Sequence, residues 1–257
     1  MIDAGARIDP GARLAGDVDI GPGCLIGAGV EIGAGTRIAP YVVIHGPTRM
    51  GRQNHIHSFC VIGGDPQDKK YQDERGTRLE IGDGNTIREH CTINRGTMQG
   101  GGVTRLGHHN WIMANVHIAH DCQVGNHAVF ANNTALAGHV IIEDYVILGG
   151  FTGVHQFCHV GAYSFAAIAS VIVKDVPPYL MVAGNTAETR GLNREGLKRH
   201  GFPAETIQTL RQAYKILYRQ HLPLNEAVEQ LKALNGGSAE VQRLVDFVCR
   251  STRGIVR

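Results

Sequence analysis

Residues 14–38, "LAGDVDIGPGCLIGAGVEIGAGTRI", carry a large aliphatic residue at every sixth position. The same spacing holds over three stretches of the chain, 2–62, 81–93 and 106–172, with two exceptions, a phenylalanine at 130 and an alanine at 166. A period of six matches neither the 3.6-residue period of an α-helix nor the two-residue period of a simple strand. It indicates short strands joined by turns, in which each strand points one aliphatic side chain inward.

Such hexapeptide repeats are typical of a parallel β-helix, a solenoid whose stacked coils bury one continuous apolar column. Glycine often follows the aliphatic residue, where it relieves steric conflict in a tight turn. The frame is interrupted near 63–80 and 94–105, and a solenoid tolerates loop insertions at such places. We therefore expect a β-helix over residues 1–185 that carries two inserted loops.

The repeat resembles that of hexapeptide-repeat acyltransferases. This resemblance implies three hexapeptides, or about 18 residues, in each coil of a triangular prism. It also implies that the coil is left-handed, which the period alone does not determine.

Small residues recur four positions after each aliphatic residue, which indicates a second, tighter inward position. Five of the six cysteines take this position, so we interpret them as reduced and packed rather than as disulfides or zinc ligands. The sixth, Cys249, lies in a helical pattern and is also expected to pack. The five are Cys24, Cys60, Cys91, Cys122 and Cys158.

The six-residue period ends at "KDVPPYL", 174–180, because two prolines cannot continue a strand ladder. From about residue 203 the apolar residues follow helical spacing in three runs. The second run stops at "NGG", 235–237, and the third begins after Ser238, a predicted N-cap. We therefore predict an all-β, left-handed parallel β-helix followed by a small α-helical C-terminal domain over 190–257.

The composition limits the classes of function. The formal net charge of the 257-residue chain is only +2, which gives no case for a nucleic-acid-binding protein. No apolar run is long enough for membrane insertion, and the N-terminus lacks the apolar core of a signal peptide. We expect a cytoplasmic protein.

Chemistry-bearing residues gather along one predicted edge. One coil after His120 comes Gly138, and one coil later comes Gln156, flanked by His155, while His139 follows Gly138. Stacked coils lie roughly 4.8 Å apart, so these residues should collect on one edge of the prism. A neutral histidine can take a proton from a hydroxyl, and a glycine leaves its N–H open to an oxyanion. The edge predicts an acyl-transfer site, with a plain solvated edge as the alternative.

Asp121 is a candidate to orient the His120 imidazole. Adjacent residues in a strand usually point in opposite directions, so the sequence leaves this pairing open.

Several longer motifs resemble those of the acyl-(acyl-carrier-protein)–UDP-N-acetylglucosamine O-acyltransferase family, and the match runs nearly end to end. The resemblance implies a cytoplasmic homotrimer with active sites between neighbouring prisms. It implies transfer of a (3R)-hydroxyacyl chain from acyl carrier protein to the 3-hydroxyl of UDP-N-acetylglucosamine, the first step of lipid A biosynthesis, without metal, cofactor or covalent intermediate. The motifs are "VHIAHDCQVGN", "NNTALAGHV", "GVHQFCHVGA", "KDVPPY", "EGLKRHGF" and "RSTRGIVR".

The resemblance also implies a role for each matching position. His120 would be the general base, Asp121 its partner and Gly138 the oxyanion donor. The positive charge of Arg199 would suit the diphosphate of the nucleotide. Substrate contacts are implied for Asp68 and Lys70 in "PQDKKY", and for His117, His139, His155, Gln156, Asn193 and Arg199.

Three positions depart from the family pattern. Asn94 in "INRGT" stands where relatives carry histidine, and Lys69 stands where they tend to be apolar. Ile168 falls where relatives carry glycine or a bulkier residue that ends the acyl groove. We predict that Ile168 shortens the preferred chain to about ten carbons rather than about fourteen.

Other interpretations stay open at this stage. A coenzyme A donor, an amino acceptor in place of the 3-hydroxyl, a zinc-dependent lyase of the γ-carbonic anhydrase type and a scaffold without activity are the alternatives. The charged loop "DPQDKKYQDERGTR" is predicted to cover substrate, and "RGTMQGGGVTR" to frame the site. Five arginines are candidates to dock an acidic carrier protein: Arg75, Arg78, Arg88, Arg95 and Arg105.

Overall fold

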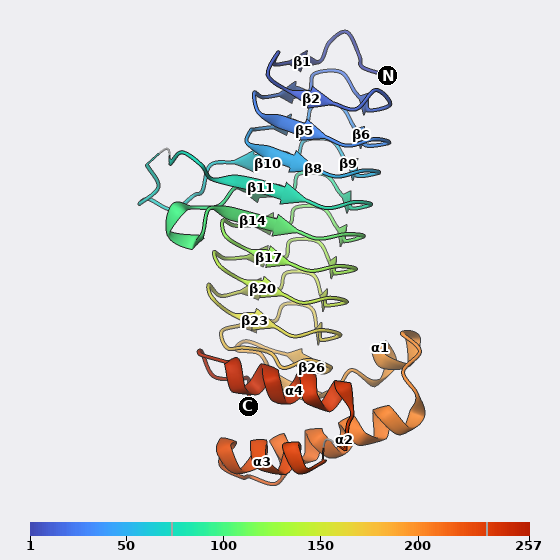
Figure 1. Ribbon diagram of the computed structural model, residues 1–257, viewed down its shortest axis with the longest axis vertical. Coiled ribbons are helices and arrows are strands. Elements are labelled where there is room, and N and C mark those ends of the chain that lie inside the picture. The colour runs from blue at the N-terminus through green and yellow to red at the C-terminus, as the bar shows by residue number, and fades with distance from the viewer. Residues whose placement is uncertain (73, 235) are drawn as a thin grey trace.

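The computed structural model describes residues 1–72, 74–234 and 236–257 and shows a column of stacked coils followed by a group of helices (Figure 1). The N-terminus lies at one end of the column and the helices lie at the other. Two predicted features include residues outside this description, namely the charged loop, with Asp73, and the helix stop, with Asn235.

Short strands form three sheets, one on each face of the prism, and all pairings are parallel except that of the last two strands. The first sheet contains β1 (Arg7–Ile8), β4 (Leu25–Ile26), β7 (Val43–Ile44), β10 (Val61–Gly64), β13 (Thr92–Asn94), β16 (His117–Ile118), β19 (Ala135–Leu136), β22 (Gly153–Val154) and β25 (Val171–Ile172). The second contains β2 (Arg13–Leu14), β5 (Val30–Ile32), β8 (Thr48–Met50), β11 (Arg78–Ile81), β14 (Val103–Leu106), β17 (Gln123–Val124), β20 (Ile141–Ile142) and β23 (His159–Val160). The third contains β3 (Asp19–Ile20), β6 (Arg37–Ile38), β9 (His55–Ile56), β12 (Thr86–Ile87), β15 (Trp111–Ile112), β18 (Val129–Phe130), β21 (Ile147–Leu148), β24 (Phe165–Ala166), β26 (Leu180–Ala183) and β27 (Glu188–Leu192).

The register of the strands confirms the predicted coil length and the position of both insertions. His117 pairs with Ala135, which is 18 residues further along the chain. Val61 pairs with Thr92, and Thr92 pairs with His117, so the two coils that contain the insertions take 31 and 25 residues. The second insertion includes a short 3₁₀ helix, η1 (Met98–Gly100).

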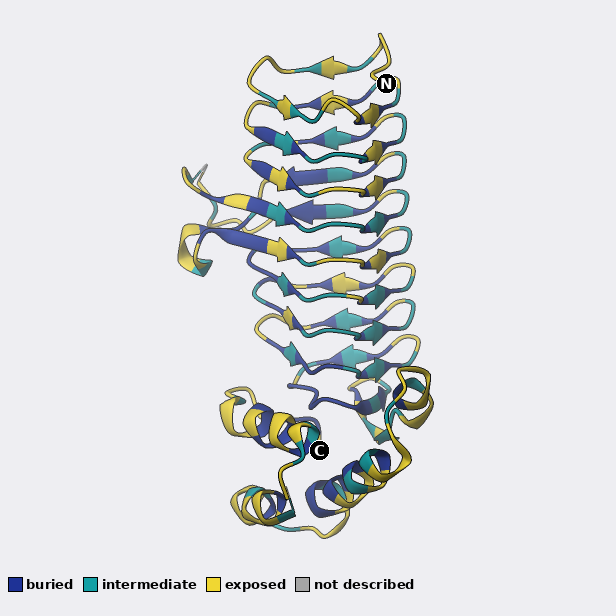
Figure 2. Ribbon diagram, turned by 45° about the vertical axis from the view of Figure 1, so that its right-hand side comes forward, coloured by how far each residue is buried: buried dark blue, intermediate teal, exposed yellow. Residues whose placement is uncertain are grey.

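From Ile20 to Ile172, the aliphatic residue of each hexapeptide is buried, and the ribbon of Figure 2 is dark blue at these positions. The column is less complete at its N-terminal end, where Ile8 and Leu14 are half-buried because no further coil covers them. Removing such side chains from water stabilises the fold by about 25 cal/mol per Å² of apolar surface.

The five cysteines at the second inward position are free thiols and fully buried, as the sequence predicts. Burial raises the pKa of the Cys122 thiol to about 12, so this thiol stays protonated at neutral pH. The expectation that Cys249 packs was wrong, because this residue lies on the exposed side of an amphipathic helix.

Four helices follow the prism: α1 (Arg194–Arg199), α2 (Ala204–Arg219), α3 (Leu224–Leu234) and α4 (Ala239–Arg250). Their apolar faces form a second core that reaches Tyr179 at the end of the prism. Ser238 caps α4 as predicted, since its hydroxyl accepts a hydrogen bond of 3.3 Å from the Val241 N–H. The short helix α1 precedes the first predicted helical run.

Strand β27 pairs with β26 and lies across the junction between the two predicted domains. The division into 1–185 and 190–257 therefore remains a prediction. None of the helices described is both long and apolar enough to cross a membrane.

Candidate active site

Both loop insertions and the predicted catalytic residues lie at one corner of the prism, between the first and the second sheet. Both insertions leave the prism there, between β10 and β11 and between β13 and β14, and project to the same side (Figure 1). The turns that contain His120, Gly138 and Gln156 follow at the same corner in the next three coils. The insertions are therefore placed to cover the column of residues that the repeat spacing predicts.

A cleft of about 750 Å³ lies at this corner and extends over the outer face of the first sheet. Its floor consists of small residues, Ala135 and Gly153, and leads to Val171. The residues singled out from the sequence that line it are Asp68, Lys70, Asn94, His117, His120, Gly138, His155 and Gln156.

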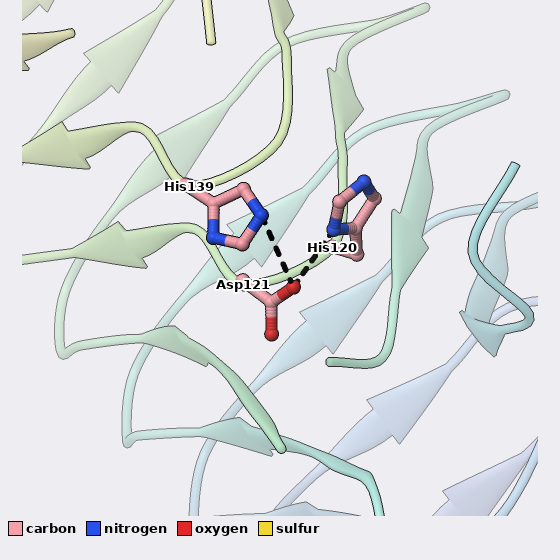
Figure 3. A group of neighbouring side chains, drawn as sticks. All are labelled: His120, Asp121 and His139. Atoms are coloured by element: carbon pink, nitrogen blue, oxygen red, sulfur yellow. Dashed lines mark hydrogen bonds and ion pairs between the residues drawn. The ribbon is translucent and has the colours of Figure 1, made fainter. Parts of the chain in front are cut away.

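His120 and Asp121 point toward one another although they are adjacent in the chain (Figure 3). They belong to a turn rather than to a strand, and Asp121 has a φ of 61°, in the left-handed region. This conformation turns the carboxylate back toward the imidazole, so that Nδ1 of His120 lies 2.8 Å from Oδ2 of Asp121. The orientation problem left open by the sequence is thus resolved by turn geometry.

The Asp121 carboxylate is buried, with only 1% of its side chain exposed. Burial alone would raise its pKa, but hydrogen bonds from His120 and Thr97 outweigh that effect and hold the pKa below the usual value. Since the carboxylate accepts a hydrogen bond from Nδ1, the proton of neutral His120 lies on Nδ1 and the lone pair on Nε2.

The His120 imidazole packs against the Cα atom of Gly138. A Cβ atom built at Gly138 would lie 2.6 Å from Cε1 and 2.8 Å from Nε2 of His120, closer than a real Cβ comes to any atom. In the described parts of the chain, no group accepts a hydrogen bond from the Gly138 N–H. Gly138 thus lies beside the nitrogen that carries the lone pair, as the predicted 18-residue coil places it.

Two further histidines surround this pair. Nε2 of His139 lies 3.7 Å from Oδ2 of Asp121, and Nδ1 of His117 lies 2.7 Å from the hydroxyl of Thr92. Burial lowers the pKa of His117 and, despite the nearby Asp121, that of His139 as well. Both shifts favour the neutral imidazole, which limits extra positive charge beside His120.

The His155 and Gln156 side chains line the cleft one coil beyond Gly138, and Nδ1 of His155 lies 3.1 Å from the Gln156 carbonyl oxygen. Asp68 and Lys70 reach the cleft from the first insertion, where the Lys70 N–H donates to the Asp68 carboxylate at 3.0 Å. The structure thus brings together the substrate-binding candidates of the prism.

Asn94, which stands where relatives carry histidine, is buried at the edge of the cleft. Its Nδ2 donates to the Asp65 carbonyl at 2.8 Å, whereas its Oδ1 is buried and finds no partner among the described residues. An unpaired buried acceptor of this kind costs about 1–3 kcal/mol.

Asp121 and His139 contact His120 without lining the cleft themselves, and three further candidates lie away from the cleft of a single chain. Ile168 is 70% exposed in the turn between β24 and β25, at the opposite edge of the first sheet from His120. Asn193 caps α1, because its Oδ1 accepts from the Gly196 N–H at 3.2 Å, and its Nδ2 donates to the Tyr163 carbonyl at 2.9 Å. Arg199 lies at the end of the same helix.

Four of the five arginines proposed to dock a carrier protein are paired with acidic residues of this chain. Arg95, with 12% of its side chain exposed, binds Asp65 and Tyr71, which corrects the expectation for this residue. Arg78 and Arg105 share Glu80, and Arg88 pairs with Glu89.

His120, Asp121 and His139 also have the spacing of a possible metal site, since one ligand atom from each falls within 4.8 Å of the others. However, Asp121 already accepts hydrogen bonds on both oxygens. The expectation that the reaction needs no metal remains a prediction.

Thr97 and Thr92, which bind Asp121 and His117, escaped the sequence analysis. Thr97 lies in an aperiodic insertion, and Thr92 occupies an outward strand position where any polar residue is common. Neither position carries a signal of its own.

Comparisons with known proteins agree with this geometry. The family model "Bacterial transferase hexapeptide (six repeats)" matches residues 1–34, 29–64 and 104–138, and "Udp N-acetylglucosamine O-acyltransferase; Domain 2" matches residues 175–256. An acyl-[acyl-carrier-protein]–UDP-N-acetylglucosamine O-acyltransferase of Thiobacillus denitrificans is 57% identical over 98% of this chain and 97% of its own length. The enzyme of the same name from Stutzerimonas stutzeri is 52% identical over 100% of this chain and 99% of its own length.

Solved structures are equally similar. The UDP-N-acetylglucosamine acyltransferase of Francisella novicida has a TM-score of 0.98 and 42% identity, and covers 100% of this chain and 94% of its own. The Acinetobacter baumannii enzyme has a TM-score of 0.97 and 50% identity, and the match covers 100% of this chain and 99% of that enzyme's chain.

Repeat, fold and site together define a hexapeptide-repeat transferase with a left-handed parallel β-helix and a helical C-terminal part, which confirms the predicted fold class. More particularly, the chain belongs to the family of acyl-[acyl-carrier-protein]–UDP-N-acetylglucosamine O-acyltransferases.

Proposed function

We propose that this chain transfers a (3R)-hydroxyacyl chain from acyl carrier protein to the 3-hydroxyl of UDP-N-acetylglucosamine, in the first step of lipid A biosynthesis. Membership of the family supports the donor and the acceptor. The observation that supports the chemistry is the packing of His120, held by Asp121, against the bare backbone of Gly138 inside the cleft.

In this proposal His120 is the general base. Its Nε2 removes the proton of the sugar hydroxyl while the hydroxyl oxygen attacks the thioester carbonyl carbon of the donor. The carbonyl oxygen becomes an oxyanion, to which the Gly138 N–H donates a hydrogen bond. The carbon–sulfur bond then breaks, and the leaving thiolate takes the proton from the imidazolium, so no covalent enzyme intermediate forms.

The remaining cleft residues would hold the two substrates. We assign the sugar nucleotide to the corner where Asp68, Lys70 and His139 lie close to His120. His117, His155 and Gln156 would contact the donor or the sugar. The acyl chain would run from His120 over Ala135 and Gly153 toward the edge that carries Ile168, because small residues leave room along this face.

We further propose a homotrimer. Asn193 and Arg199 lie outside the cleft of their own chain, so a nucleotide contact requires that a neighbouring copy present its α1. The cleft would then lie between two prisms. We place the reaction in the cytoplasm, where acyl carrier protein and nucleotide sugars are available.

The decisive experiment is an acyl-transfer assay with UDP-N-acetylglucosamine and hydroxyacyl carrier proteins of graded chain length. We expect His120→Ala to lower kcat by at least about 100-fold, whereas His127→Ala, at another corner of the prism, serves as the matched control. Unchanged turnover of His120→Ala would remove the proposed base. Acyl-coenzyme A donors, the 3-amino sugar nucleotide and metal analysis of the purified protein test the alternatives in the same series.

A further inference from the structure

The second insertion encloses the carboxylate that orients the proposed base. The Thr97 N–H donates to Oδ1 of Asp121 at 2.8 Å, and the Thr97 hydroxyl donates to Oδ2 at 2.7 Å. Oδ2 is the same oxygen that faces Nδ1 of His120. One residue of the insertion therefore supplies two of the three hydrogen bonds to this carboxylate.

The direction of the Thr97 hydroxyl is determined by a second contact. The Gly100 N–H donates to the same hydroxyl oxygen at 3.1 Å, as the N-cap interaction of η1. Since the oxygen accepts there, its single proton is free to point at Asp121. With donors on both oxygens, the carboxyl group is stabilised in its ionised form.

The insertion is shaped closely around the carboxylate. A Cβ atom at Gly100 would lie 2.0 Å from Cγ of Asp121, so only glycine permits this approach. On the opposite side, the backbone N–H of Asp121 donates to the hydroxyl of Thr104 at 2.7 Å. The loop itself is tied to the first insertion, because the Met98 N–H donates to Glu74 at 2.5 Å.

We propose that Thr97 is a positioning residue of the acyl-transfer reaction. It holds the Asp121 carboxylate ionised and oriented, so that Asp121 binds Nδ1–H of His120 and leaves Nε2 free to act as base. This inference rests on the proposed function and adds to it a residue of the insertion that touches no substrate. The titratable groups that face the carboxylate are His120 and His139. Two further groups interact electrostatically with these rings, His117 with His120 and Asp68 with His139.

The test is Thr97→Val, which keeps the shape of the side chain and removes the donor. We expect kcat to fall roughly 10- to 100-fold with KM for UDP-N-acetylglucosamine within about twofold. The acid limb of the kcat/KM–pH profile reports protonation of the base His120. It should move to higher pH, because a carboxylate that has lost a hydrogen-bond donor stabilises the His120 imidazolium more strongly. Thr97→Ser restores the donor and should return kcat to within about threefold of the wild type.

Thr36→Val is the matched control, since Thr36 is also buried, donates one hydrogen bond (to Gly51) and accepts one (from Asn54), far from the cleft. It should lower stability and leave kcat and the pH profile unchanged. Should Thr97→Val fail to fold, Thr97→Ala removes the same donor and is judged in the same way.

The inference is overturned if Thr97→Val retains wild-type kcat and acid limb, or if Thr97→Ser is equally impaired. It is also overturned if Thr36→Val, at a similar loss of thermal midpoint, loses as much kcat as Thr97→Val. These outcomes presuppose an active wild type and an inactive His120→Ala variant. A wild type without transfer, or a fully active His120→Ala, contradicts the proposed function instead.

Discussion

At the scale of single residues, the site depends on a close approach between an imidazole and a glycine. Because the repeat stacks coils in register, position 138 lies directly beside position 120, and only the absence of a side chain leaves space for the ring. The same absence exposes the amide that the proposed mechanism uses.

Gly138→Ala should therefore abolish catalysis without unfolding the prism. The new methyl would lie 2.6 Å from the His120 ring, so the imidazole must move away from its bond to Asp121. We expect kcat to fall at least about 100-fold, since such groups must be placed to within about half an ångström, and this is measured in the acyl-transfer assay.

Gly16→Ala is the control for this change, because a Cβ atom at Gly16 meets nothing within 4 Å and the residue lies in an N-terminal coil. Its activity should equal that of the wild type. A Gly138→Ala enzyme with normal turnover would show that the ring does not need its observed position.

Ile168 gives a second prediction at this scale. The exposed side chain lies at the edge of the first sheet, three positions before Val171 of the cleft. If it ends the acyl groove, Ile168→Gly should raise the activity on donors of about fourteen carbons relative to about ten by at least about tenfold. Measuring both donors with each enzyme provides the internal control, and an unchanged ratio would count against the assignment.

At the scale of elements, a ladder of buried asparagines links successive coils. Asn54 Oδ1 accepts from the backbone N–H and the amide of Asn85 at 2.9 and 3.0 Å, and Asn85 Oδ1 accepts from both donors of Asn110 at 2.9 Å. The ladder ends at Ala128, whose N–H donates to Asn110 Oδ1. These bonds hold together the very coils that carry the two insertions.

Asn85→Ala should lower the free energy of unfolding by roughly 2–5 kcal/mol. The change leaves the backbone N–H of Asn110 and the Gly107 carbonyl without their partners in a buried site, while the Asn110 amide keeps its bond to the Gly125 carbonyl. Each unpaired group costs about 1–3 kcal/mol. Urea unfolding followed by circular dichroism measures the difference. Asn132→Ala, at an exposed turn, is the control and should change stability by less than about 0.5 kcal/mol.

At the scale of the whole molecule, Glu143 joins the prism to the C-terminal helices. Its carboxylate faces His159 at 3.0 Å, accepts from the Ala162 N–H at 2.9 Å and pairs with Arg250 at the end of α4. Burial alone would raise the pKa of Glu143, but these partners together hold it below the usual value.

A lowered pKa means that Glu143 stabilises the folded state fully above the unfolded-state pKa, near 4.5, and that this contribution is lost as pH falls through the folded-state pKa. Glu143→Gln should therefore cost roughly 1–3 kcal/mol at pH 7, with a smaller deficit at pH values well below 4.5. Denaturation at a series of pH values measures this.

Glu229→Gln, which removes an exposed pair with Lys232 on α3, is the control and should have no measurable effect at any pH. A deficit of Glu143→Gln that does not shrink in acid would contradict the electrostatic account.

The sequence by itself determined the solenoid, its buried cysteines and the places of both insertions, because these features follow from the period of six. The column of His120 and Gly138 needed in addition the coil of 18 residues, which the family resemblance implies and the strand register confirms. The helical tail and its Ser238 cap were also predictable, because helix signals are local.

Only the tertiary structure decided how Asp121 turns toward His120, how Thr97 closes over that carboxylate, and that Arg95 is engaged inside the protein. It also placed Asn193 and Arg199 outside the cleft of their own chain. The physical reason is that these contacts depend on a left-handed turn and on the path of two aperiodic loops, and that path is set by long-range contacts that no repeat encodes.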